Sequence, residues 1–182
     1  MKKAKIKHEA ILSKLTCSQK ILQLGMSDGA LAHLLVQSGC SVKGLDLHYR
    51  NLFFKEVEVK LYSGVHIPFE VNSFDVVLLN SCLDKTNKPE SLIMQAAQIA
   101  QSRVMVIEKV PISNRDYKKD DPQWNANEKC LKKRMDLFHL YSKSEVNVSV
   151  FPYLWFYELY LYTFDVDASP KSKTQKRLYY HF

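Results

Sequence analysis

The sequence predicts an α/β fold built on a mostly parallel sheet, and three observations carry that prediction. Short apolar runs alternate with amphipathic helical segments between residues 20 and 108. A turn with glycines at positions 25 and 29 joins the first apolar run to a helix. The second apolar run ends in Asp46. A strand, a glycine turn, a helix and a strand ending in an acid form the layout by which a Rossmann-like, doubly wound sheet holds a nucleoside.

The first predicted element is an amphipathic helix over residues 3–15. Its apolar side chains recur at helical spacing, and lysines occupy the opposite face. We expect this helix to cover an edge of the sheet, because exposed strand edges need protection. The alternative is that it caps a ligand pocket.

Five strands and their helices follow in order. The strands are expected at residues 20–24, 41–46, 59–62, 74–80 and 103–108. Ser27 or Asp28 can cap the helix after the first strand, and Ser38–Gly39 ends it. A short helix is expected at 51–58 and a longer one at 88–99, where Pro89 suits a helix start. The run 74–80 is almost uninterruptedly apolar, which predicts a strand buried on both faces.

The alternation breaks after residue 108. Residues 111–127 are polar and predict a long surface connection, followed by a helix at 128–141. Two further strands, 145–151 and 156–164, are separated by little more than Pro152 and predict an antiparallel hairpin. The complete expectation is a seven-stranded, mostly parallel sheet with helices on both faces and a C-terminal antiparallel hairpin.

Length and composition bound the organisation of the chain. A chain of 182 residues with 46% hydrophobic residues suits one domain, which we place at residues 1–167, with a polar basic tail at 168–182. No apolar run is long enough to cross a bilayer, and no secretory signal is recognisable. The four cysteines form no CxxC pair, so we expect reduced thiols, no metal site and a cytoplasmic protein.

The net charge of +7 raises the question of an acidic partner. Two of the basic clusters lie at the chain ends, where solvated charged tails are common. A third cluster, residues 129–134, lies on a predicted helix. Nucleic acid therefore stays open as a partner, but the charge pattern favours it only weakly.

A ligand of such a sheet binds beyond the carboxyl ends of the strands. Gly25 and Gly29 would let the backbone approach it closely, and the Asp46 carboxylate could accept hydrogen bonds from both ribose hydroxyls. Asp28 precedes a helix, where its negative charge would repel a dinucleotide's phosphates and attract a cationic ligand. This charge logic favours S-adenosylmethionine, which carries a sulfonium and an ammonium, over NAD or FAD.

At these residues the chain resembles the class I S-adenosylmethionine-dependent methyltransferases, in particular the small type 11 group. Residues 24–29 match the family's glycine loop, and Gly44-Leu45-Asp46 matches its ribose-binding acid. Residues 67–77 look very like the segment that leads into the family's fourth strand, and residues 83–90 resemble the turn and helix start after it. The resemblance spans residues 21–108 and continues more loosely to 164.

The sequence departs from the family pattern at several positions. Gln23 stands where the family usually has an acid, Ser27 where it has a glycine, and Ser63 where it often has an adenine-contacting aspartate. Residues 101–103 replace a glycine-rich turn. The cofactor-binding residues implied by the resemblance are Gln23, Gly25, Met26, Ser27, Gly29, Asp46, Leu47, Ser63, Gly64 and Asn80.

The resemblance implies methyl transfer from S-adenosylmethionine to a small or medium-sized acceptor, with S-adenosylhomocysteine as product. Two alternatives stay open: a catalytically inactive methyltransferase-like binding or partner module, and an RNA methyltransferase. Asn80-Ser81-Cys82-Leu83 is not the NPP[FYW] tetrad of enzymes that methylate exocyclic amines of DNA bases. No catalytic residue is assigned. His48, His66 and His139 are weak candidates for a general base, and Asp84 and Glu108 lie at strand ends.

Overall fold

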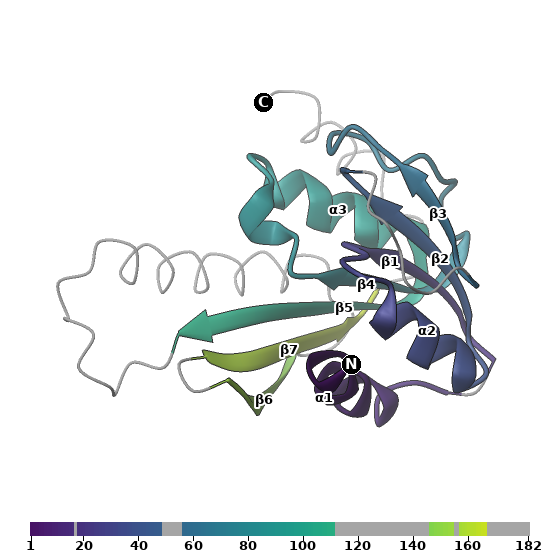
Figure 1. Ribbon diagram of the computed structural model, residues 1–182. Helices are drawn as coiled ribbons and strands as arrows, with labels where there is room; N and C mark the ends of the chain where they lie inside the picture. Colours follow the sequence, from purple (N-terminus) through teal and green to yellow (C-terminus); the bar gives the residue numbers. More distant parts are fainter. Residues whose placement is uncertain (17, 49–55, 112–145, 155–156, 167–182) are drawn as a thin grey trace, which may run out of the picture.

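The computed structural model describes residues 1–16, 18–48, 56–111, 146–154 and 157–166, which form three helices, a 3-10 turn and a seven-stranded sheet (Figure 1). The elements in chain order are α1 (Lys2–Leu12), β1 (Lys20–Leu24), α2 (Ala30–Gln37), β2 (Ser41–Asp46), β3 (Glu58–Leu61), β4 (Phe74–Asn80), η1 (Leu83–Lys85), α3 (Pro89–Ile99), β5 (Ala100–Pro111), β6 (Asn147–Leu154) and β7 (Tyr157–Asp165).

The strand order in the sheet is β3-β2-β1-β4-β5-β7-β6. The first five strands pair in parallel, and β7 pairs antiparallel with both β5 and β6. The chain therefore winds outward from β1 to β3 and then returns to β4 on the other side of β1. That reversal between β1 and β4 is the topological switch point, where ligands of open α/β sheets bind.

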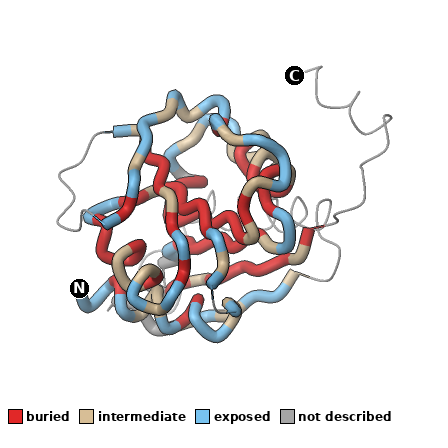
Figure 2. The backbone as a smooth tube through the Cα atoms, turned by 90° about the vertical axis from the view of Figure 1, so that its right-hand side faces the viewer, coloured by how far each residue is buried: buried red, intermediate tan, exposed pale blue. Residues whose placement is uncertain are grey.

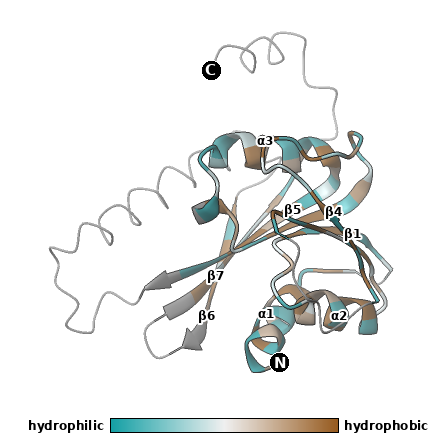
Figure 3. Cartoon of the chain, turned by 45° about the horizontal axis from the view of Figure 1, so that its top comes forward, coloured by the Kyte–Doolittle hydropathy of each residue, from teal (hydrophilic) through white to brown (hydrophobic). Residues whose placement is uncertain are grey.

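The central strands are apolar on both faces, and successive side chains alternate between two cores. Leu22, Val77 and Leu79 face α3, together with Val104 and Val106 of β5. Their neighbours in sequence, among them Ile21, Val76 and Leu78, face α1 and α2. Figure 3 shows α3 on one side of the sheet and α1 and α2 on the other. In Figure 2 the buried backbone runs through the middle of the molecule and the exposed loops surround it.

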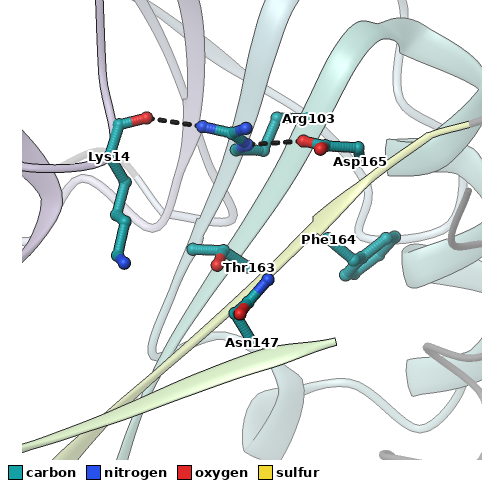
Figure 4. A pocket seen from close by; sticks show the side chains of 6 residues that line it. All are labelled: Lys14, Arg103, Asn147, Thr163, Phe164 and Asp165. Carbon is teal, nitrogen blue, oxygen red and sulfur yellow. Dashed lines mark hydrogen bonds and ion pairs between the residues drawn. The ribbon is translucent and has the colours of Figure 1, made fainter. Parts of the chain in front are cut away.

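The helix α1 packs beside α2 and also contacts the hairpin strands β6 and β7. The Arg103 side chain holds the turn that follows α1. Its Nε donates to Asp165 Oδ1 at 2.7 Å, and its Nη1 donates to the Lys14 carbonyl at 2.6 Å (Figure 4). Arg103 therefore joins the α1–β1 segment to β5 and β7. The expected edge-covering role of the helix agrees with its contact to the edge strand β6.

Most element boundaries agree with the sequence-based expectation within a few residues, and β1, β2 and β4 coincide with it. The expected helix at 51–58 is wrong at its end, because Glu58 already belongs to β3, where Lys43 of β2 pairs with it. β5 is longer than expected because α3 passes directly into it at Ala100, whose extended ψ of 136° ends the helix without a glycine turn. β6 continues through Pro152 to Leu154 with an irregularity between those residues.

The expected connection at 111–127, apart from its first residue, and the expected helix at 128–141 lie outside the described residues, as does the basic tail. None of the described helices is long and apolar enough to cross a membrane. Cys40 and Cys82 are buried.

Candidate functional site

The loop between β1 and α2 lies at the switch point and has an unusual backbone. Gly25 and Gly29 both have φ of 81°, and Ser27 between them has φ of 56°. Positive φ is costly for a residue with a Cβ, so serine here adopts the conformation that a glycine would adopt more cheaply. Ser27 therefore has a left-handed backbone conformation at the position where the family pattern has a glycine.

Gly25 lies where β1, β2 and β4 come together. Its N–H donates to the Leu45 carbonyl at 2.9 Å, and its own carbonyl accepts a hydrogen bond from Asn80 Nδ2 at 2.8 Å. Gln23 Nε2 donates to the same carbonyl at 3.2 Å. A Cβ on Gly25 would lie 2.4 Å from the Asn80 carbonyl oxygen, so only glycine fits between the strands.

Asp46 ends β2 and connects that strand to the glycine loop. Its Oδ2 accepts a hydrogen bond from the Met26 N–H at 2.9 Å, and its Oδ1 accepts one from the His48 N–H at 3.3 Å. The side chain is largely buried, with 8% exposure for the residue. The carboxylate therefore lies against the loop at the carboxyl ends of the parallel strands, as the sequence predicts. Backbone donors orient it there.

Met26 has two separate functions in this arrangement. Its backbone holds Asp46, while its side chain is buried under the loop and packs on Gly44 of β2. A Cβ at Gly44 would lie 2.6 Å from the Met26 sulfur and 2.9 Å from the adjoining carbons. The glycine before Leu45-Asp46 thus makes room for the large residue in the loop.

Gly44→Ala is expected to destabilise the fold by about 1–3 kcal/mol, because the Met26 side chain must leave its place. In a Met26→Ala background the added methyl group enters vacated space, so the cost of Gly44→Ala should largely disappear. Urea unfolding of the two single variants and the double variant measures this coupling. Additive free energies of unfolding would contradict the contact between the two residues.

A cavity of about 310 Å³ opens beside the glycine loop. Its walls come from the first seven residues, from the loop and α2, and from the end of β4, and its lining residues are Met1, Lys2, Lys3, Ala4, Lys7, Met26, Ser27, Asp28, Leu31 and Asn80. The helix α1 therefore also borders this cavity. Capping a pocket was the alternative role expected for this helix. Lys7 Nζ reaches Asn80 Oδ1 at 2.5 Å and Ser81 Oγ at 3.3 Å.

The segment after β3 lies on the other side of the site, near the carboxyl end of β2. Gly64 has φ of 79°, and a Cβ there would lie 2.8 Å from the Leu47 side chain, so the segment passes close to the end of β2. Gln95 of α3 anchors it: the Ile67 N–H donates to Gln95 Oε1 at 2.8 Å, and Gln95 Nε2 donates to the Val65 carbonyl at 2.9 Å. Ser63 is exposed next to it.

The structure arranges the predicted residues in two groups. Met26, Ser27 and Asn80 line the cavity, with Gln23, Gly25 and Gly29 forming the loop and its support. Asp46, Leu47, Ser63 and Gly64 do not line the cavity and lie toward β2 and β3. The Met26–Asp46 hydrogen bond joins the two groups.

The other candidate side chains have structural functions or lie elsewhere. Asp28 Oδ1 accepts from the Ala30 N–H at 3.1 Å, so Asp28, and not Ser27, supports the start of α2. Glu108 is buried and accepts from the Leu83 N–H at 3.1 Å, which fixes the turn after β4. His48 and His66 are exposed, and His139 lies outside the described residues.

Two residues that the sequence did not single out belong to this region. Lys7 looked like one of several solvated lysines on the amphipathic helix, and only the packing of α1 brings it to Asn80. Tyr62 follows β3, and its N–H donates to the Asp46 carbonyl at 3.2 Å. Burial, with Cys82 and Asp46 nearby, raises the pKa of the Tyr62 phenol to about 12. Its position after a strand that runs parallel to β2 was the available signal.

Comparison with known proteins gives a match to one family model. Residues 22–107 match the family model of the methyltransferase domain. This segment holds the glycine loop, Asp46 and Asn80, and in the structure it runs from β1 into β5. This match indicates a methyltransferase domain over just under half of the chain. The cofactor of that family is S-adenosylmethionine.

One curated relative matches about half of this chain. A demethylmenaquinone methyltransferase of Tropheryma whipplei is 26% identical over 103 residues, which are 51% of this chain and 43% of that protein. The chain thus matches less than half the length of this curated relative.

Solved structures show the same fold for the methyltransferase domain. An S-adenosylmethionine-dependent methyltransferase of Aquifex aeolicus superposes with a TM-score of 0.59 at 15% identity, over 88% of this chain and 91% of that one. Phosphoethanolamine N-methyltransferase 2 of Haemonchus contortus, solved with S-adenosyl-L-methionine, gives 0.65 at 12% identity, over 88% of this chain and 52% of that one. These likenesses confirm the predicted Rossmann-like α/β architecture.

Two further features lie outside the group of predicted site residues. Among the described residues no three His, Cys, Asp or Glu side chains gather where a metal ion could bind. A second cavity, of about 170 Å³, lies beside Arg103 and Asp165 at the opposite end of β5 from Glu108 (Figure 4). That end is the amino end of the parallel strands, away from the switch point.

Proposed function

We propose that this chain binds S-adenosylmethionine across the carboxyl ends of β1, β2 and β4 and transfers its methyl group to a small or medium-sized acceptor. The observation that carries the proposal is the Asp46 carboxylate, held against the glycine loop by the Met26 N–H at the switch point of the sheet. In this proposal Asp46 accepts hydrogen bonds from the ribose hydroxyls, next to a backbone that has no side chain at Gly25.

The residues present fit that cofactor in shape and charge. Ser27 of the glycine loop and Asn80 at the end of β4 border a cavity of about 310 Å³ beside Asp28. Gln23 is buried, and its Oε1 has no hydrogen-bond partner among the described residues, so this oxygen can accept from a donor at the site. Asp28 brings a carboxylate to the cavity wall, which favours a cationic ligand over a pyrophosphate.

S-adenosylmethionine supplies an electrophilic methyl group on a sulfonium when it is bound. In the proposed site Asp46 would hold the ribose, and the loop at 25–29 would follow the methionine portion. The cavity walls of α1 and Asn80 would exclude water and set the direction from which an acceptor approaches. Positioning of this kind supplies much of the rate of a bimolecular displacement.

The acceptor belongs to the class of small or medium-sized molecules in this proposal. The relatives named above act on different acceptors by their names, demethylmenaquinone and phosphoethanolamine. The shared fold therefore supports the cofactor half of the proposal, and the acceptor half depends on the chain's own walls.

A thermal-shift panel with S-adenosylmethionine, S-adenosylhomocysteine and NAD tests the cofactor. A ligand at 100 times its Kd stabilises the fold by about 2.7 kcal/mol, which raises the Tm of a domain of this size by about 5–10 °C. We expect this increase with both S-adenosyl compounds and none with NAD, whose adenosine is the same but whose pyrophosphate would meet Asp28. No increase at millimolar S-adenosyl compound, or an equal one with NAD, would refute the proposal.

A further inference from the structure

The cavity beside the glycine loop contains a feature that the proposed function does not use. The Lys7 side chain extends from α1 to the end of β4. Its ammonium donates to Asn80 Oδ1 at 2.5 Å and to Ser81 Oγ at 3.3 Å. Asn80 in turn donates to the Gly25 carbonyl at 2.8 Å. One amide side chain thus separates the ammonium from the glycine turn.

Charges of both signs act on Lys7. The pKa of Lys7 is lowered to about 8, chiefly by burial and also by Lys109 and Lys85, while Glu108 and Asp28 act in the opposite direction. Glu108 and Lys109 come from β5, Lys85 from η1 and Asp28 from the β1–α2 loop, so the charges that act on Lys7 come from three other segments. A partly buried ammonium with two cationic neighbours is stabilised by an anionic ligand.

Opposite charges line the same cavity. Lys7 lies on the α1 wall, and Asp28 lies on the loop wall, where it precedes α2. The methionine end of S-adenosylmethionine carries both an ammonium and a carboxylate. A cavity with an acidic and a basic group in its walls is complementary to a zwitterion of this kind.

We propose that Lys7 binds the carboxylate of the cofactor's methionine portion and that Asp28 attracts its ammonium. Because the inference rests on the proposed function, it assigns a further binding residue to the same site. In this arrangement α1 is part of the cofactor site as well as a cover for the sheet. The other lysines of the cavity wall, Lys2 and Lys3, are exposed and add a more distant positive field.

Calorimetry at pH 7 with two ligands tests the inference. The first ligand is S-adenosylhomocysteine, and the second is S-adenosyl-3-thiopropylamine, which keeps the ammonium and lacks the carboxylate. Lys7→Met should weaken S-adenosylhomocysteine by about tenfold or more, the range expected for a lost charged hydrogen bond, and change the amine by less than about twofold. Lys7→Arg should retain the affinity for S-adenosylhomocysteine. Lys5→Met, an exposed lysine of the same helix, is the matched control and should change neither affinity.

A pH profile provides a second readout. Lys7 is protonated below about pH 8 in the free protein and loses its proton above that value. The affinity of the wild-type protein for S-adenosylhomocysteine should therefore fall between pH 7 and pH 9 by up to about tenfold more than that of Lys7→Arg. The ligand's own ammonium titrates identically in both proteins, so the ratio isolates Lys7.

The outcomes separate this inference from the proposed function. If wild-type protein binds S-adenosylhomocysteine and Lys7→Met binds it equally well, or loses both ligands to the same extent, the Lys7 assignment is overturned and the proposed function remains. If wild-type protein binds neither ligand, both are overturned.

Discussion

Gly25→Ala is expected to abolish binding of S-adenosylhomocysteine and to destabilise the fold more than any other single glycine substitution in the loop region. Two costs combine at this position. The φ of 81° costs a residue with a Cβ about 1–2 kcal/mol, and the new Cβ would lie 2.4 Å from the Asn80 carbonyl oxygen. A backbone carbonyl within a central strand cannot move aside without disturbing the pairing of β4 with β1 and β5.

Gly39→Ala is the matched control for that substitution. Gly39 has φ of 88°, close to that of Gly25, but a Cβ there would meet no atom within 4 Å. Urea unfolding of both variants therefore separates the backbone cost from the steric one. We expect Gly39→Ala to cost about 1–2 kcal/mol and Gly25→Ala about 2 kcal/mol or more beyond that. Ligand binding should survive in Gly39→Ala, because Gly39 lies at the far end of α2, before β2 begins. Equal costs for the two variants would contradict the close approach of β1 and β4.

The sheet could be predicted from the sequence because its signals are local. Each central strand is a short apolar run bounded by turn residues, and each helix shows a 3.6-residue period, so the type and order of elements followed directly. The position of Asp46 at the end of β2 was equally predictable, since parallel neighbouring strands bring their carboxyl ends to one edge. The predicted boundaries were wrong where a boundary depends on strand pairing. Glu58, for example, belongs to β3 because it pairs with Lys43 of β2.

The residues of the site were harder to predict where they depend on tertiary packing. Nothing in the sequence distinguishes Lys7 from the lysines at positions 2, 3 and 5, because all four belong to one polar stretch. Only the packing of α1 brings Lys7 to Asn80. The pairing of Met26 with Gly44 is of the same kind: each residue is unremarkable alone, and the contact that links them is visible only in three dimensions.

The departure at Ser27 illustrates how a local rule can be broken without loss of the loop. Ser27 stands where the family pattern has a glycine, the residue that adopts positive φ at least cost. Ser27 keeps the positive φ of 56° and lies in the cavity wall, exposed, with glycines two residues away on both sides. Serine in this conformation therefore costs conformational energy that a glycine would not cost.

Asp46→Ala is expected to weaken S-adenosylhomocysteine binding by about 1–3 kcal/mol, roughly 5- to 150-fold. The variant removes the proposed ribose acceptor and also leaves the Met26 N–H without its partner at 2.9 Å. Asp75→Ala controls for the second effect. Asp75 accepts a hydrogen bond from the Lys20 N–H at 2.7 Å at the opposite end of β4, far from the proposed site. It should lower stability by a comparable amount and leave ligand affinity unchanged.

A ligand pair decides whether the lost affinity at Asp46 comes from the ribose. Adenosine and 2′,3′-dideoxyadenosine differ only in the hydroxyl groups that Asp46 is proposed to bind. Wild-type protein should prefer adenosine, and Asp46→Ala should bind the two nucleosides with nearly equal affinity, because the carboxylate that distinguishes them is gone. Asp46→Asn keeps one acceptor oxygen for the Met26 N–H, so its preference should be reduced while the loop stays in place. If Asp46→Ala retained the full preference, the hydroxyls would be bound by other groups, and Asp46 would serve only to hold the glycine loop.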